Sequence, residues 1–184
     1  MLDTRWFRSP WRPSSQRGAK GRERYEPDAD PALTLLGPAQ WRWLAEQLAQ
    51  PADVRFIYSS IQVLAQGHGY ERWGLFPHEY ERLLQLLDAA PARATLLMSG
   101  DRHIGALYRV TEGLRRPLFE LTSSGLTHPW RTAEEDDPAR LGELVRVNHY
   151  GVVDVDWQAA ELRLRLHDTQ GQPLLQHAVA FSNP

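Results

Sequence analysis

The chain has 184 residues and a formal net charge of −2 at pH 7. This length supports one domain with a hydrophobic core, and the near-neutral charge excludes a general attraction to nucleic acid or anionic membranes. The absence of cysteine excludes disulfides, thiolate nucleophiles and cysteine-ligated zinc. No apolar run approaches the roughly 20 residues that cross a bilayer, and no signal-peptide core opens the sequence.

The first 31 residues are predicted to be mostly irregular. Residues 1–7 are typical of the end of a strand, whereas residues 8–31 are rich in Pro, Ser, Gly and Arg without apolar periodicity. Such a composition predicts a long surface loop. The loop is basic through Arg8, Arg12, Arg17, Lys20, Arg22 and Arg24. Two interpretations stay open, namely a solvated loop or an arm that faces phosphate groups or nucleic acid.

Helices and strands alternate in the next part of the sequence. Gly37-Pro38 opens a predicted helix that ends near Pro51, and its buried face is formed by Trp41, Leu44, Ala45 and Leu48. Residues 54–64 are apolar and partly β-branched, which predicts a strand. Pro77 begins a second helix, and residues 94–98 form the next strand. The apolar stripe of the second helix consists of Tyr80, Leu83, Leu84 and Leu87.

The second half of the chain is predicted to be rich in strands, at 104–110, 118–123, 150–157, 161–167 and 174–181. Residues 127–147 are predicted to form a polar loop with a short helix at 138–144. The acidic run at 134–137 is interpreted as solvated surface. Alternating strands and helices followed by consecutive strands predict an α/β layered fold whose second half is antiparallel.

The strongest candidate for a functional site is the stretch LLMSGDRHIGALY at 96–108. It puts Asp101 and His103 on a turn between two apolar strands, and ligands of α/β sheets bind beyond such strand ends. Carboxylate and imidazole groups are ligands for hard or borderline metals. In an extended turn, side chains two positions apart can point to the same side. The alternative is a plain hydrogen-bonded turn without a ligand.

Three further polar residues, Asp3, Gln62 and His68, follow or end predicted strands. Gln62 needs a hydrogen-bond partner if it is buried, so it is either structural or part of a polar cleft. The glycines beside His68 allow close approach of a ligand but equally suit a turn, so an exposed loop histidine is the default interpretation. The sequence has neither a Gly-x-Ser-x-Gly elbow nor a Gly-Lys-Ser/Thr phosphate loop, which argues against a serine hydrolase and a nucleotide-hydrolysing motor.

Seven segments carry a wider similarity along the chain. They are LDTRWFRSP at 2–10, LLGPAQWRWLAEQL at 35–48, VRFIYSSIQVL at 54–64, HGYERWGLFPHEYERLLQLL at 68–87, LMSGDRH at 97–103, LFELTSSGLTHPW at 118–130 and NHYGVVDVDW at 148–157. In order and spacing they resemble the C-terminal half of the PhoD-like (alkaline phosphatase D) branch of the calcineurin-like metallophosphatases. Residues 1–184 are therefore expected to form a single partial domain of that family.

The resemblance implies a sandwich of mixed sheets flanked by helices, and hydrolysis of phosphate mono- or diesters at a multinuclear metal centre. The expected metals are calcium, iron, manganese or zinc, which activate water and neutralise charge on the phosphoryl group. Asp101 and His103 resemble the family's late metal-ligand turn and are predicted to be catalytic. The predicted substrate-binding residues are Arg5, His68 and Arg102, and the predicted cleft residues are Asp3 and Gln62.

The chain departs from the family pattern in its metal ligands. The Asp-x-His and Gly-Asp turns of the family's first half do not precede Leu2, and Ile61 stands where many relatives have an asparagine. A binuclear site takes about six protein donors, and this chain supplies two or three. We expect either an enzyme that a missing N-terminal half completes in trans, or a non-catalytic remnant with an anion-binding cleft. Nucleic-acid binding is not favoured, and the compartment stays undetermined, although relatives are often exported.

Overall fold

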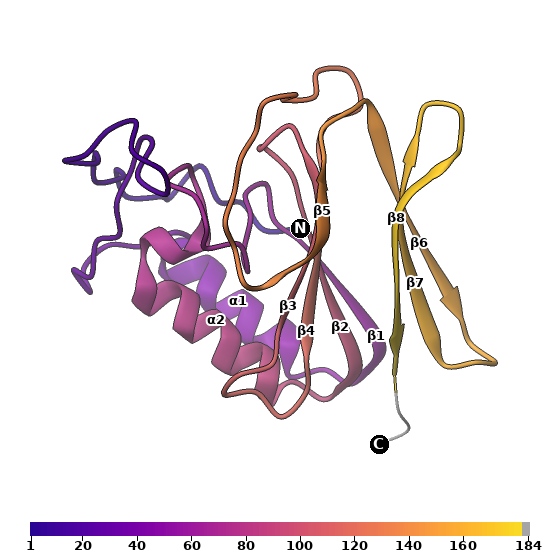
Figure 1. Cartoon of the computed structure of the whole chain (residues 1–184). Coiled ribbons are helices and arrows are strands. Elements are labelled where there is room, and N and C mark those ends of the chain that lie inside the picture. Colours follow the sequence, from indigo (N-terminus) through magenta and orange to yellow (C-terminus); the bar gives the residue numbers. More distant parts are fainter. Residues whose placement is uncertain (182–184) are drawn as a thin grey trace.

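The computed structural model describes residues 1–181. In chain order the elements are α1 (Gly37–Leu48), β1 (Ala52–Tyr58), the 3-10 helix η1 (Trp73–Leu75), α2 (Pro77–Ala89), β2 (Ala92–Ser99), β3 (Gly105–Val110), β4 (Leu118–Ser123), β5 (Arg140–Val145), β6 (His149–Asp156), β7 (Glu161–Asp168) and β8 (Pro173–Ala180). They form three layers (Figure 1). A five-stranded sheet, β1-β2-β4-β3-β5, lies between the two α-helices and a three-stranded sheet, β6-β7-β8.

Both α-helices form where the sequence predicts them, because a proline starts each one and apolar side chains recur on one face. Trp41 of α1 and Leu83 and Leu87 of α2 are buried in the core between the helices and the central sheet. The buried carboxylate of Glu79 accepts the indole N–H of Trp41 at 2.8 Å and the main-chain N–H of Leu35 at 2.7 Å. This acid therefore fixes the start of α2 against α1.

The central sheet is mixed. β1, β2 and β4 run parallel, whereas β3 is antiparallel to both β4 and β5. Since successive side chains of a strand face opposite sides, Leu97 of β2 packs toward the helices and Leu96 toward the second sheet. The second sheet is an antiparallel meander. The predicted α/β layers with an antiparallel second half are thus confirmed.

Three local predictions are wrong. Residues 138–144 contain no helix, because Arg140–Val145 pair with β3 as strand β5, and Gly142 at φ 74° interrupts the strand pattern that would have revealed it. The strand predicted at 54–64 ends at Tyr58, where the chain leaves the sheet. Residues 1–7 form no strand, and only the Leu2 N–H reaches the sheet, at 2.8 Å from the Tyr58 oxygen.

Residues 8–31 form no helix or strand beyond isolated bridges, and pack beside the loop at 67–70. The main-chain N–H groups of Arg24 and Tyr25 donate to the Gly69 oxygen, and the Gly69 N–H donates to Glu23. Arg12 forms an ion pair with Glu26 at 3.0 Å, which reduces the free positive charge of this segment. Within residues 1–181, neither α-helix is long and apolar enough to cross a membrane.

Glu120 of β4 holds the segment that follows β1. Its fully buried carboxylate accepts the main-chain N–H groups of Val63, at 2.9 Å, and Leu64, at 2.5 Å, together with the Ser99 hydroxyl. Burial raises the pKa of Glu120, while these donors act against that rise. The chain therefore turns away from the sheet at this acid and not at a glycine or proline.

We expect Glu120→Ala to lower the free energy of unfolding by about 2–4 kcal/mol, because it leaves buried N–H groups without an acceptor. Urea unfolding followed by tryptophan fluorescence measures the change. Glu143→Ala, at an exposed position of β5, is the matched control and should change stability by less than about 0.5 kcal/mol. Equal stability of the two variants would show that Glu120 does not hold this segment.

Candidate functional site

The turn between β2 and β3 has an unusual backbone. Asp101 and His103 adopt φ values of 71° and 55°, a region that non-glycine residues seldom occupy. Both residues are exposed, whereas Arg102 between them is only 3% exposed. The turn therefore presents a carboxylate and an imidazole on the surface and sends a guanidinium into the interior. Such backbone conformations persist where surrounding contacts hold them, and they cluster at functional sites.

Contacts with residues 128–130 hold the turn. The His103 Nδ1 atom lies 2.8 Å from the His128 oxygen, and the Trp130 N–H donates to the His103 oxygen at 2.7 Å. Because a carbonyl oxygen only accepts hydrogen bonds, the neutral form of the His103 ring carries its proton on Nδ1 and its lone pair on Nε2. Metal-binding histidines are oriented in this way.

A cavity of about 900 Å³ opens above the turn. Asp101, Arg102 and His103 line it together with His128 and Trp130. Its lining contains four arginines and two carboxylates, and is therefore basic although the whole chain is slightly acidic. The lining residues with these charges are Arg5, Arg24, Arg102, Arg131, Glu71 and Asp101.

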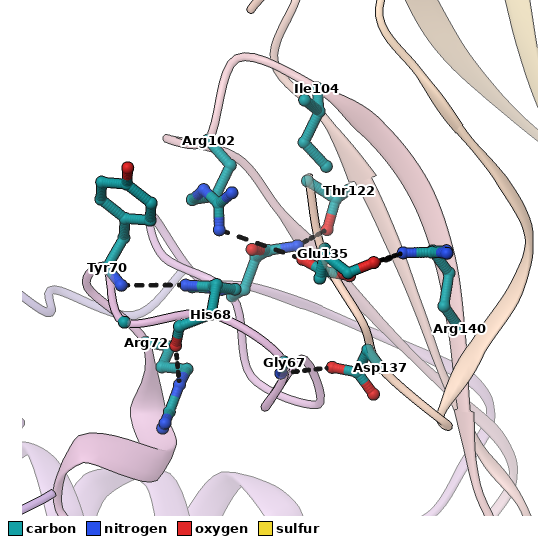
Figure 2. A network of polar contacts seen from close by, with 12 residues as sticks. Gly67, His68, Tyr70, Arg72, Arg102, Ile104, Thr122, Glu135, Asp137 and Arg140 are labelled. Atoms are coloured by element: carbon teal, nitrogen blue, oxygen red, sulfur yellow. Dashed lines mark hydrogen bonds and ion pairs between the residues drawn. The ribbon is translucent and has the colours of Figure 1, made fainter. Parts of the chain in front are cut away.

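The guanidinium of Arg102 lies in the floor of this cavity. Its Cζ atom lies 4.6 Å from the centre of the Tyr70 ring and 5.5 Å from the centre of the Trp130 ring, within the range of cation–π contacts. Glu135 Oε2 lies 3.9 Å from its Nη1 (Figure 2), too far for a hydrogen bond. None of the three Arg102 nitrogens has a hydrogen-bond partner among residues 1–181. Arg102 thus offers buried, unused donors beside the exposed turn.

His68 lies below the surface and does not line the cavity. Its Nδ1 accepts the Tyr70 N–H at 3.1 Å (Figure 2), so the ring proton is on Nε2, which is buried without a partner in the described chain. Burial and the charges of Arg102 and Arg72 hold the pKa of His68 well below its usual value. The default interpretation of an exposed histidine is wrong, because residues 23–25 pack over this loop.

The other predicted site residues are spread out. Gln62 is fully buried, and its Nε2 donates to the Tyr108 hydroxyl and to Thr122 Oγ1, each at 3.0 Å. Asp3 is exposed, accepts the N–H groups of its own turn, and does not line the cavity. Arg5 lines the cavity and pairs with Glu71. The structure therefore brings Asp101, Arg102, His103 and Arg5 together at one cavity.

The prediction that the acidic run at 134–137 is solvated surface is wrong for two of its residues. Glu135 and Asp137 are only 8% and 7% exposed. Glu135 accepts the Tyr108 hydroxyl at 2.8 Å and forms an ion pair with Arg140 at 3.5 Å, while Asp137 accepts the Gly67 N–H at 2.8 Å (Figure 2). The alternation of buried and exposed acids along 134–137 is a strand-like signal, but it gives no indication of partners that lie far along the chain.

The described residues do not form a complete metal site. Within residues 1–181, no group of three or more His, Asp or Glu side chains is placed to hold one ion. Asp101 and His103 supply two donors, and the His128 ring lies 5.5 Å from the His103 ring, centroid to centroid. His128 could not be predicted as a neighbour of the turn, because it follows a different strand and comes near the turn only in the folded chain.

The fold and the site define a layered α/β protein with an Asp-x-His turn over a basic cavity. The family model described as PhoD-like phosphatase matches residues 1–166, so the chain belongs to the PhoD-like phosphatase family. A solved structure titled "Structure of PhoD" has the same fold, with a TM-score of 0.69 and 15% sequence identity. The alignment covers 99% of this chain but only 41% of that chain. No curated protein matches the sequence.

We expect Glu135→Ala to destabilise the fold by about 3 kcal/mol, since it leaves Arg102 and Arg140 without their buried counter-charge. Thermal or urea unfolding measures this loss. The neighbouring Glu134 is exposed, so Glu134→Ala is a control with the same change of charge. A similar stability for both variants would contradict a structural role of the Glu135 ion pairs.

Proposed function

We propose that this chain is the part of a metal-dependent phosphate mono- or diesterase that carries one ligand turn and the phosphoryl-binding side of its cleft. The observation that carries the proposal is the pairing of two features at one cavity. His103 has a free Nε2 lone pair next to Asp101, and Arg102 has buried N–H groups without acceptors. A metal ion and an anionic phosphoryl group are the species that these two features suit.

In this proposal each group has a separate task. Asp101 and His103 are two ligands of a calcium, iron, manganese or zinc ion, and His128, through its carbonyl oxygen, orients the His103 ring. A metal bound there supplies an activated water and neutralises phosphoryl charge. Arg102 and Arg5 attract the phosphate ester, whose oxygens accept the planar guanidinium N–H groups. His68 is buried outside the cavity lining and therefore makes no direct contact with the ester in this proposal.

The proposed enzyme needs ligands from outside this chain. Two donors are too few for a catalytic metal site, and the chain spans 41% of the solved PhoD chain. β1 is an edge strand of the described sheet, with Phe56 37% and Tyr58 47% exposed. Unpaired edges with exposed aromatic side chains are places where a further strand adds. We therefore propose that an additional segment docks at β1 and contributes the other metal ligands.

A second candidate function is an anion-binding module without catalysis. The observation that favours it is that no group of three metal-binding side chains exists within residues 1–181. Hydrolysis of bis(p-nitrophenyl) phosphate and p-nitrophenyl phosphate by the purified chain, with calcium, iron, manganese or zinc added in turn, separates the two. Metal-dependent turnover that His103→Ala abolishes supports an enzyme. Absence of turnover from folded protein that still binds phosphate supports the module.

We expect His103→Ala to weaken binding of Zn²⁺ or Mn²⁺ by about tenfold or more, because the variant loses one of two donors on the turn. Isothermal titration with each metal measures the affinity. His103 is exposed, so the melting temperature without metal should hardly change. His167→Ala, on β7 and outside the cavity lining, is the control. Unchanged metal affinity in His103→Ala would remove the turn from the proposed metal site.

We expect Arg102→Gln to weaken binding of inorganic phosphate by about tenfold, because one charge-assisted donor pair is lost. Arg131→Gln removes an exposed charge from the same cavity and should have a smaller effect, about twofold. Isothermal titration with inorganic phosphate measures both affinities. If the two variants lose phosphate affinity equally, Arg102 contributes only its positive charge to the cavity and does not hydrogen-bond the phosphate directly.

A further inference from the structure

A second cavity lies at the opposite end of the central sheet from the Asp101–His103 turn. Its volume is about 680 Å³, and its walls come from the end of α2, the beginnings of β2 and β4, the end of β3, and β8. In Figure 1 this is the end of the central sheet that lies near the end of β8. β2 has eight residues and joins the two ends, so the cavities are on the order of 25 Å apart.

Positive charge prevails in this cavity. Four arginines line it, together with a single carboxylate, Asp88. Arg115 forms an ion pair with that carboxylate, since its Nε lies 3.0 Å from Asp88 Oδ2. Its main-chain N–H also donates to Asp88 Oδ1 at 2.7 Å. The charge of Asp88 is therefore balanced by Arg115. Arg93 forms an ion pair with Asp53, outside the cavity lining, at 3.3 Å.

Two guanidinium groups are open to a ligand. The Arg109 side chain, at the end of β3, has no hydrogen bond or ion pair among the described residues. Arg116 donates only to the carbonyl oxygen of Ala92, which carries no net charge. Arg109 pairs in register with Phe119 of β4, and Arg116 precedes that residue by three positions. The two cations therefore flank the beginning of β4, Arg109 from β3 and Arg116 on the side of β2.

The wall beside these cations is partly apolar. The Phe119 ring lies 5.4 Å from the His177 ring of β8, and both residues line the cavity. Burial and the charge of Arg109 lower the pKa of His177, so this ring is neutral near pH 7. A neutral imidazole next to two guanidiniums adds hydrogen-bonding capacity without adding charge. The cavity thus combines two free cations, one neutral polar ring and an aromatic surface.

We propose that this second cavity binds a small molecule through a diphosphate group, with Arg109 and Arg116 each holding one phosphoryl unit. Planar guanidinium groups pair with phosphate oxygens in a bidentate manner, and two cations that line one cavity from either side of β4 suit two linked phosphates better than one. The volume leaves room for an organic substituent beyond the diphosphate. This site is separate from the Asp101–His103 turn, and the proposal does not depend on the proposed function.

Isothermal titration of the full chain with inorganic pyrophosphate tests the proposal. We expect saturable binding that Arg109→Gln/Arg116→Gln weakens by about tenfold or more, since charge-assisted hydrogen bonds are lost. Arg17→Gln/Arg42→Gln removes the same total charge at exposed positions elsewhere and should leave the affinity within about twofold. Arg109→Lys/Arg116→Lys keeps the charge and should recover part of the binding. Melting temperatures establish that each variant is folded.

Three outcomes would overturn the proposal. They are the absence of saturable binding of both pyrophosphate and ADP, an equal loss of affinity in both double glutamine variants, and a loss caused by Arg102→Gln but not by Arg109→Gln/Arg116→Gln. The last outcome would assign pyrophosphate to the cavity at the turn. A parallel titration with ADP distinguishes an esterified diphosphate from the free ion, and dependence on Arg109 and Arg116 in either titration supports the site.

Discussion

The burial of the Glu120 carboxylate is the constraint on which the rest of the structure depends. It gathers the main-chain N–H groups that follow β1 and thereby ends the strand. A chain of hydrogen bonds continues from it through Ser99, Thr122, Gln62 and Tyr108 to Glu135. Because buried polar groups are costly when unpaired, each member of such a network fixes the next. The core of the sheet is thus connected to the floor of the cavity.

This network explains how an exposed turn can hold an uncommon backbone. Glu135 lies at its outer end and faces Arg102, the residue between Asp101 and His103. Tyr70 and Trp130 approach the same guanidinium, and Trp130 also donates to the His103 oxygen. The turn is therefore attached to two loops by its buried middle residue, which leaves the side chains on either side of it directed outward. Rigid support of this kind suits a binding site that acts through fixed donors.

Much of the fold could be predicted because its signals are local. Prolines mark the start of both helices, and apolar periodicity identifies the helices and most strands. The sequence did not predict β5, because its pairing with β3 is a long-range interaction and Gly142 interrupts its strand-like pattern. The cavity was predicted only in part. Asp101 and His103 stand out by their type and spacing, whereas His128 and Glu135 reach the turn from a loop that the sequence describes merely as polar.

The sequence by itself determined the layered α/β class, the family resemblance and the turn that bears Asp101 and His103, because each rests on short-range pattern or composition. Only the tertiary structure decided the surroundings of these residues. It buries His68 and Glu135 and places two basic cavities at opposite ends of the sheet. It also directs the Nδ1 atom of His103 to a carbonyl oxygen, so that Nε2 remains available to a ligand. The physical reason is that burial and charge pairing depend on contacts between residues far apart in the chain, and composition carries no record of them.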